Sequence, residues 1–176
     1  MKTCCVTGNR PEKFPFNYRE KDSHEMILYT DALYRKAEEL MRRGYTGFLT
    51  GMARGVDLDF ACAVIYHKCE TFRDILDITL EAAIPYPDQT QGWNRRCREQ
   101  YDYVLSHCDK RTLISYDYFP GCEQKRNIYM VERADLVFAV WNGVEKGGTW
   151  NTIRYARRRT RPIEFLLLKD FLDRNK

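Results

Sequence analysis

The chain has 176 residues, 44% of them hydrophobic and 31% charged, and carries a net charge of +4. This composition is ordinary for a soluble globular protein, and the length suits one domain over residues 1–176 with a substantial core. No apolar run approaches the roughly 18 residues that cross a bilayer, and Met1 to Val6 lead into a strand rather than a signal peptide. We therefore expect a cytoplasmic protein without membrane contact.

The seven cysteines could indicate disulfides or a metal site. Their number is odd, no Cys-x-x-Cys pair occurs, and the three histidines are scattered along the chain. Buried, reduced thiols explain Cys4 and Cys5 in the first strand and Cys62 in an apolar helical pattern. The sequence therefore predicts neither a bound metal nor a cofactor.

Apolar periodicity predicts strands that alternate with helices along the chain. The predicted strands are residues 2–7, 47–50, 75–85, 111–116, 135–141 and 162–168. The predicted helices are residues 24–43, 57–67, 93–106, 123–134 and 149–159, and Gly44 is well placed to end the first of them. This alternation is typical of an α/β fold in which helices cover both faces of a mostly parallel sheet of about six strands.

In such a sheet, ligands bind beyond the carboxyl ends of the strands. The loops expected there are residues 8–11, 51–57, 85–93, 116–122 and 141–149. The last of them places Gly147 and Gly148 between a buried strand and a helix that Thr149 can cap. Backbone N–H groups in a Gly-rich turn before a helix favour an anion such as phosphate, although the turn could also be a simple tight connection.

A second loop of this kind, residues 51–57, includes Arg54 and ends at Asp57. Two such loops in one small domain indicate a shared ligand cleft. The guanidinium groups of Arg10 and Arg54 can each hold a phosphate through paired hydrogen bonds. Asp57 can either cap the following helix or accept a hydrogen bond from a ribose hydroxyl or a base edge.

Other strand-end residues suit the same cleft. We expect Arg126 and Asn127, near the start of the helix before the central strand, to face it. An excess of aromatic residues could stack a base there, or could pack beneath the loops that carry them; these residues are Tyr86, Trp93, Tyr116, Tyr118, Phe119 and Trp141. No Gly-x-Ser-x-Gly motif or Walker lysine motif is present.

Several of these segments, taken together and in order, resemble the YpsA/YoqJ-like proteins of the SLOG superfamily, which is named for the DNA-processing protein Smf (DprA) and the cytokinin-activating LOG enzymes. The segments that carry the resemblance are residues 7–11, 50–57, 84–86 with Gln89 and Trp93, 124–127, 133–135, and 141–143 with 147–149. The resemblance implies a Rossmann-like three-layer sandwich and a nucleotide-related ligand, with loops 51–57 and 147–149 holding its phosphate or ribose.

The ligand-binding residues expected from the loops and the resemblance are Gly8, Asn9, Arg10, Gly51, Met52, Arg54, Gly55, Asp57, Pro85, Tyr86, Gln89, Trp93, Arg126, Asn127, Trp141, Asn142, Gly147, Gly148 and Thr149. LOG-type hydrolases carry a Pro-Gly-Gly-x-Gly-Thr loop followed within a few residues by a catalytic Glu. Here Asn151 and Thr152 follow Thr149, so no catalytic residue is assigned. This departure favours binding over hydrolysis.

The leading hypothesis is therefore binding or sensing of a nucleotide-derived small molecule, such as an ADP-ribose-like ligand. The first alternative is a phosphoribohydrolase that uses Asp57, Glu123 or Glu145. The second, weaker because most of the charge lies in helices, is single-stranded DNA binding through basic residues Arg95, Arg96, Arg98 and the run Arg157 to Arg159. A homo-oligomer is compatible with the sequence, which names neither the ligand nor a downstream partner.

Overall fold

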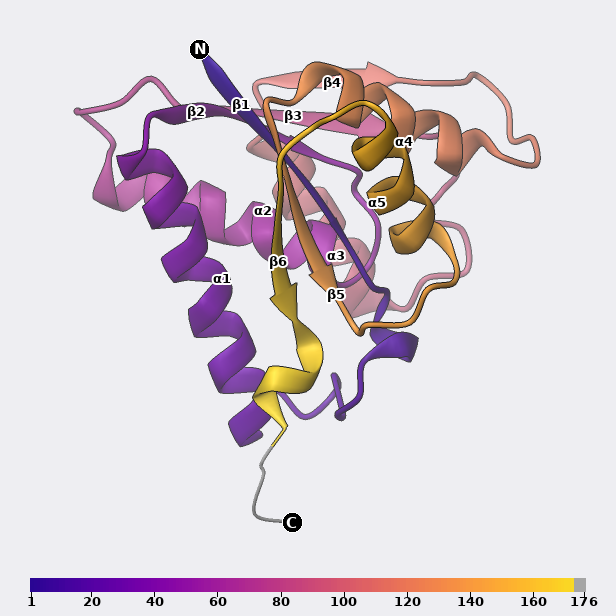
Figure 1. Ribbon diagram of the computed structural model, residues 1–176, viewed down its shortest axis with the longest axis horizontal. Coiled ribbons are helices and arrows are strands. Elements are labelled where there is room, and N and C mark those ends of the chain that lie inside the picture. Colours follow the sequence, from indigo (N-terminus) through magenta and orange to yellow (C-terminus); the bar gives the residue numbers. More distant parts are fainter. Residues whose placement is uncertain (173–176) are drawn as a thin grey trace.

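The computed structural model describes residues 1–172 and shows a six-stranded sheet in which every neighbouring pair of strands is parallel (Figure 1). The strands are β1 (Lys2–Gly8), β2 (Tyr45–Thr50), β3 (Thr79–Ile84), β4 (Lys110–Leu113), β5 (Leu136–Trp141) and β6 (Ile163–Leu167). Their order across the sheet is β4-β3-β2-β1-β5-β6. The chain thus builds the sheet outward from β1 to β4 and then returns to the other side of β1.

Within residues 1–172, five α-helices cover the two faces of this sheet: α1 (His24–Arg42), α2 (Val56–Tyr66), α3 (Arg95–Ser106), α4 (Cys122–Arg133) and α5 (Gly148–Arg158). Successive strand residues point to opposite faces. Cys4 accordingly packs with residues of α1, α2 and α3, whereas Cys5 packs with residues of α4 and α5. In Figure 1, α4 and α5 lie together on one side of the sheet. The α/β, Rossmann-like three-layer sandwich is confirmed.

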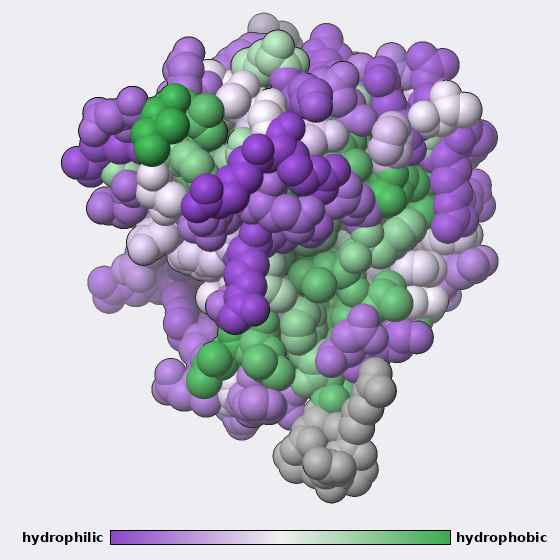
Figure 2. All heavy atoms as spheres, turned by 60° about the vertical axis from the view of Figure 1, so that its left-hand side comes forward, coloured by the Kyte–Doolittle hydropathy of each residue, from purple (hydrophilic) through white to green (hydrophobic). Residues whose placement is uncertain are grey.

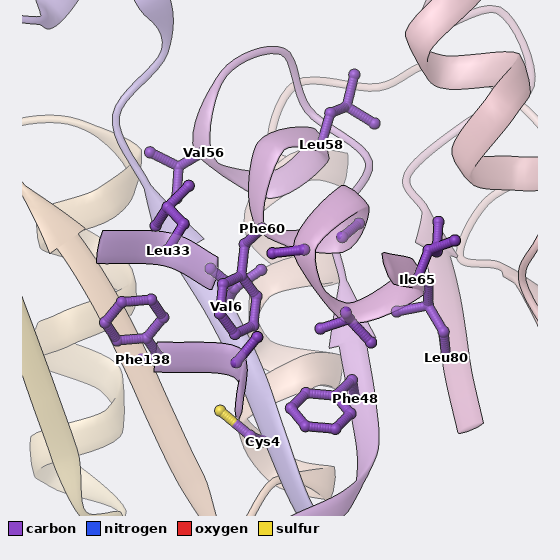
Figure 3. Close-up of a cluster of buried hydrophobic side chains, with 14 of the residues drawn as sticks. Cys4, Val6, Leu33, Phe48, Val56, Leu58, Phe60, Ile65, Leu80 and Phe138 are labelled. Atoms are coloured by element: carbon purple, nitrogen blue, oxygen red, sulfur yellow. The ribbon is translucent and has the colours of Figure 1, made fainter. Parts of the chain in front are cut away.

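The larger core lies between the sheet and α2. Phe60 of α2 packs on Phe138 of β5 with ring centroids 5.1 Å apart, and Val6 lies beside them (Figure 3). Eight of the eleven residues of α2 are buried, because α1 and α3 cover the side of the helix that faces away from the strands. Such a helix has little freedom to shift, so its first turn is held firmly at the carboxyl edge of the sheet.

Three details differ from the sequence-based expectations. Strand β3 begins at Thr79 rather than at residue 75, because the N–H groups of Ile75 and Leu76 donate to the Phe72 carbonyl after a π-helical turn, His67–Thr71. Strand β4 ends at Leu113 instead of continuing to residue 116. The third is Cys62, which is half-buried although Cys4 and Cys5 are fully buried.

The surface is mixed in character. Figure 2 shows a face on which a band of hydrophilic side chains crosses the upper middle and hydrophobic ones gather below and to the right of it. Within residues 1–172, no helix combines the length and the hydropathy that crossing a membrane requires.

Candidate ligand-binding site

A crevice opens where the chain reverses its direction across the sheet, between β1 and β5. Gly8 pairs with Val140 at the carboxyl ends of these strands. Beyond them the two loops remain tied together, because Asn9 donates its N–H to the Val140 carbonyl at 3.2 Å and accepts the Asn142 N–H on Oδ1 at 2.8 Å. The connections from β1 and β5 lead to opposite faces of the sheet, which is the usual origin of a binding crevice in such folds.

A cavity of about 390 Å³ occupies this place and is called the main cavity below. It is formed by the loop after β1 and by the first turns of three helices. Its lining comprises Thr7, Gly8, Asn9, Arg10, Lys13, Ala53, Asp57, Gly121, Glu123, Gln124, Arg126, Asn127, Gly148, Thr149 and Asn151. Both glycine-bearing loops therefore reach one cavity at the same edge of the sheet.

The three helices that begin at the main cavity share one feature. The N-cap residues of α2, α4 and α5 are Gly55, Gly121 and Gly147, with φ of 86°, 102° and 88°, and no side chain caps these helices. The first turn of each helix contributes residues to the lining, so N–H donors without a partner inside the helix and the positive end of a helix dipole lie beside the cavity. Such an arrangement suits an anionic group.

The expected capping roles of Asp57 and Thr149 are wrong. Each is the second residue of its helix, because α2 begins at Val56 and α5 at Gly148. The preceding backbone has positive φ, which glycine adopts readily, and this turns the chain into the helix without help from a side chain. Both side chains instead line the main cavity.

A buried ion pair holds the floor of the cavity. Arg126 is 5% exposed and Asp57 is 6% exposed, with 3.7 Å between Arg126 Nη1 and Asp57 Oδ2. Arg126 also donates from Nη1 to the Gly51 carbonyl and from Nε to Asn127 Oδ1 at 2.9 Å. Burial raises the pKa of the Asp57 carboxyl although the Arg126 guanidinium opposes this, and burial lowers the pKa of Arg126.

This pair explains the glycine at position 51. A Cβ on Gly51 would lie 2.4 Å from Arg126 Nη1 and 2.6 Å from Asp57 Oδ2, too close for either side chain to stay in place. The next residue, Met52, is fully buried with a φ of 58°, and its N–H donates to Thr50 Oγ1 at 3.2 Å. Gly51 and Met52 thus shape the loop that carries Asp57 and do not face the cavity themselves.

Two further cations lie above the buried pair. Arg10 forms an ion pair with Glu123, and both side chains are 47% exposed. The ammonium of Lys13 lies against the start of α5, 2.7 Å from where a Cβ on Gly147 would stand. Among residues 1–172 Lys13 forms no ion pair, so a positive charge lies at a helix N-terminus without a balancing carboxylate. An anion in the cavity would relieve this repulsion.

A smaller space of about 120 Å³, called the side chamber below, adjoins the main cavity and shares Arg10, Ala53, Glu123 and Arg126 with it. Its other lining residues are Arg54, Tyr86, Gln89, Gln91 and Trp93. Arg54 Nη2 is 2.9 Å from Glu12 Oε1, and the guanidinium lies 5.7 Å from the centre of the Trp93 ring. Arg54 and the start of α5 therefore line different compartments.

The expected ligand-binding residues fall into three groups. Those in the main cavity are Gly8, Asn9, Arg10, Asp57, Arg126, Asn127, Gly148 and Thr149. Those that line the side chamber but not the main cavity are Arg54, Tyr86, Gln89 and Trp93. Neither compartment is lined by Gly51, Met52, Gly55, Pro85, Trp141, Asn142 or Gly147.

Trp141 illustrates the third group. Its ring stacks on Trp150 at 5.4 Å with 9° between the planes, and its Nε1 donates to the Val144 carbonyl at 3.1 Å. It packs beneath its own loop, which was the alternative interpretation of the aromatic residues. Tyr86 behaves differently, because it lines the side chamber and packs edge to face against Tyr118 at 5.1 Å.

Sequence reasoning missed Lys13, Gln124 and Asn151, which all line the main cavity. Lys13 ends a short 3-10 helix, Pro11–Lys13, in a segment that shows no periodicity. Asn151 could have been found, because it lies three residues after Gly148 and residues at that spacing share a helix face. Gln124 directly follows Glu123, which the sequence singled out only as a carboxylate.

The chain is similar to known proteins over nearly its whole length. The YpsA model, described as the YspA SLOG family, matches residues 4–170. UPF0398 proteins from Bacillus thuringiensis (strain Al Hakam) and Bacillus cereus (strain AH187) are each 28% identical over 180 residues, covering 98% of this chain and 94% of theirs. The chain therefore belongs to the YpsA SLOG family.

Proposed function

We propose that the protein binds a nucleotide-derived small molecule in the main cavity, with a phosphate group at the starts of α2, α4 and α5. The observation that carries the proposal is the convergence of three helix N-termini without side-chain caps on one cavity that also holds basic side chains. Backbone N–H groups and helix dipoles favour an anion at such a place. Membership of the SLOG family supports a nucleotide-related role in general.

The lining can also recognise the rest of a nucleotide. Arg10 and Lys13 supply charge for a phosphate, while Gln124, Asn127 and Glu123 supply amide and carboxylate groups that can bond ribose hydroxyls. A volume of about 390 Å³ lies within the usual range of small-molecule sites, roughly 300–1,000 Å³. The cavity is thus large enough for a ligand beyond a lone phosphate ion.

A thermal-shift screen over nucleoside mono- and diphosphates, dinucleotides and cyclic nucleotides tests the proposal. A ligand at about one hundred times its Kd should stabilise the protein by about 2.7 kcal/mol. Lys13→Gln should reduce the shift of the best ligand. Arg158→Gln, on an exposed position at the far end of α5, is the charge-matched control and should not. No shift with any nucleotide, or equal losses in both variants, would contradict a defined nucleotide site.

Hydrolysis of an N-glycosidic bond is the second candidate, because the Asp57 and Glu123 carboxyls line the same cavity and burial raises the pKa of Asp57. The first turn of α5 offers no carboxylate, however. Asn151 faces the cavity there, and Thr152 is buried and donates from Oγ1 to the Gly148 carbonyl at 3.0 Å. Glu145 lies outside both compartments. Binding without turnover is therefore the stronger proposal.

Chromatography of nucleoside monophosphates incubated with the protein separates these two candidates. We expect no release of free base or ribose phosphate. Turnover that is lost in Glu123→Gln would instead establish the hydrolase.

Single-stranded DNA binding has weaker support. Arg157 and Arg158 are in the last turn of α5, whose first turn lines the main cavity, and Arg159 Nε is 3.2 Å from Glu132 Oε1. Arg95 likewise pairs with Glu99 at 2.7 Å on the exposed side of α3. These charges lie at two different helices, α3 and α5, and Arg95 and Arg159 are already paired with carboxylates.

A further inference from the structure

We propose that the side chamber is a second anion subsite and that the ligand is a nucleotide with two phosphate groups, one in each compartment. This inference rests on the proposed function of the main cavity. It concerns a different set of side chains, because Arg54, Gln89 and Gln91 line the side chamber and not the main cavity.

The side chamber has an excess of positive charge. Three guanidinium groups line it, those of Arg10, Arg54 and Arg126, against the single carboxylate of Glu123. Gln89 is 7% exposed and its Nε2 is held by the Met52 carbonyl at 3.4 Å, so its amide has a set position in the wall. Guanidinium and amide N–H groups that surround so small a space suit the oxygens of a phosphate.

Two of these cations, Arg10 and Arg54, have only exposed partners, whereas Arg126 is held by the buried Asp57. Arg54 pairs with Glu12, which is 58% exposed, and Arg10 pairs with Glu123, which is 47% exposed. Ion pairs of this exposure contribute only about 0–1 kcal/mol, so exchanging the carboxylate for a phosphate costs little. The Arg54 guanidinium also lies over the Trp93 ring and is 27% exposed, which leaves it partly ordered before a ligand arrives.

The boundary between the compartments explains why two groups are needed. Arg10 and Glu123 line both spaces, so their ion pair lies where the compartments meet. Lys13 and the first turn of α5 are on the main-cavity side, and Arg54 is on the other. One phosphate cannot satisfy Lys13 and Arg54 together, since they line different compartments. A ligand with an anionic group on each side of Arg10 can.

Calorimetric titration of AMP, ADP and adenosine 3′,5′-bisphosphate into the wild type and three variants tests the inference. Arg54→Gln removes a cation that lines the side chamber but not the main cavity, and Lys13→Gln removes one that lines the main cavity but not the side chamber. Arg95→Gln removes a side chain that is 89% exposed on α3 and is the control. Thermal melts of each variant establish that it is folded.

We expect at least one of the two ligands with two phosphates to bind about tenfold or more tightly than AMP. Arg54→Gln should remove that advantage, a loss of about 1.4 kcal/mol or more, and leave AMP affinity within about twofold. Lys13→Gln should weaken all three ligands, and Arg95→Gln none. If Arg54→Gln weakens the binding of ADP alone, the two phosphates of the ligand are adjacent. If it weakens the binding of the bisphosphate alone, they are separated. Either result supports the inference.

Two results would overturn the inference. If AMP binds as tightly as both other ligands, or if Arg54→Gln weakens AMP as much as the others, there is no second subsite although the proposed function stands. If none of the three ligands binds the wild type, the proposed function fails and this inference falls with it.

Discussion

The helices of this protein begin in two different ways. In α1 and α3 a side chain caps the first turn: Ser23 Oγ accepts the Met26 N–H at 3.3 Å, and Asn94 Oδ1 accepts the Cys97 N–H at 2.9 Å. In α2, α4 and α5 the N-cap residue is glycine, and no side chain caps the first turn. The second group begins at the main cavity, whereas neither Ser23 nor Asn94 lines it.

The difference shows where the protein keeps donors free for a ligand. Every helix start leaves N–H groups without a partner inside the helix. Away from the cavity, a side chain satisfies one of them. At the cavity, glycine omits the cap at a cost of only a few tenths of a kcal/mol relative to Ser or Asn. Three helices therefore keep their donors available, and four sets of substitutions test this contrast.

The largest effect is expected for the charges beneath the cavity. Arg126→Met leaves the Asp57 carboxylate buried without its cation and should lower the free energy of unfolding by about 3–5 kcal/mol. Arg95→Met, at the capped start of α3, removes an exposed ion pair and should cost no more than about 0.5 kcal/mol. Urea denaturation at pH 7 measures both.

The double variant Arg126→Met/Asp57→Asn should recover much of the loss, because it removes the uncompensated charge. If Arg126→Met alone lowered the free energy of unfolding by less than about 1 kcal/mol, water would reach Asp57 and the floor of the cavity would not be sealed.

Substitution by alanine should affect stability at one glycine of the cavity and not at another. A Cβ on Gly8 would lie 2.4 Å from Cβ of Val56, the first residue of α2, so Gly8→Ala should destabilise by about 1–3 kcal/mol. A Cβ on Gly148 would meet nothing within 4 Å, so Gly148→Ala should leave stability unchanged. Thermal unfolding compares the two variants. Equal losses of stability in Gly8→Ala and Gly148→Ala would show that both loops are simple tight turns.

Removing a side-chain cap should act on stability alone. Asn94→Ala deletes the acceptor for the Cys97 N–H and should cost about 1 kcal/mol. The affinity for AMP, or for the best ligand of the screen, should not change, because Asn94 lines neither compartment. Denaturation and titration of the same preparation give both values. A change in affinity would mean that the start of α3 also belongs to the site.

The smallest effect on stability should come with a clear effect on binding. Asn151→Asp adds a negative charge in the first turn of α5 and should stabilise the helix by about 0.3–1 kcal/mol. The same charge faces the main cavity and should repel a phosphate by about 1 kcal/mol, close to a fivefold loss of AMP affinity.

Asn94→Asp is the matched control, since it makes the same substitution at the capped start of α3. Its affinity for AMP should equal that of the wild type. Equal losses in the two variants would show that general charge, and not the uncapped helix starts, attracts the ligand.

Much of the fold could be predicted because its signals are local. Apolar periodicity located all six strands and all five α-helices, and Gly44, with a φ of 85°, ends α1 as expected. The start of β3 was misplaced because Leu76 and Ile78 alternate with polar residues as strand residues do. Whether such a segment joins the sheet depends on its hydrogen-bond partners, and these are set by the π-helical turn before it.

The candidate site was predicted less completely. Arg126 and Asn127 were expected at the cavity and line it, since the start of a helix after a strand-end loop lies at the carboxyl edge. Lys13 gave no signal, because its position depends on how the loop after β1 folds back against Gly147. Arg54 was expected in one cleft with loop 147–149, and it lines the side chamber that adjoins the main cavity.

Local patterns along the chain specify the alternation of strands and helices and place the glycine-bearing loops at one edge of the sheet, because periodicity and glycine conformations are local properties. Which loops share a compartment depends on tertiary contacts. Placing β5 beside β1 brings Arg10 to Glu123 across 113 residues of chain, and burial joins Arg126 to Asp57. Such contacts follow from strand order and from the exclusion of water, neither of which any short stretch of sequence specifies.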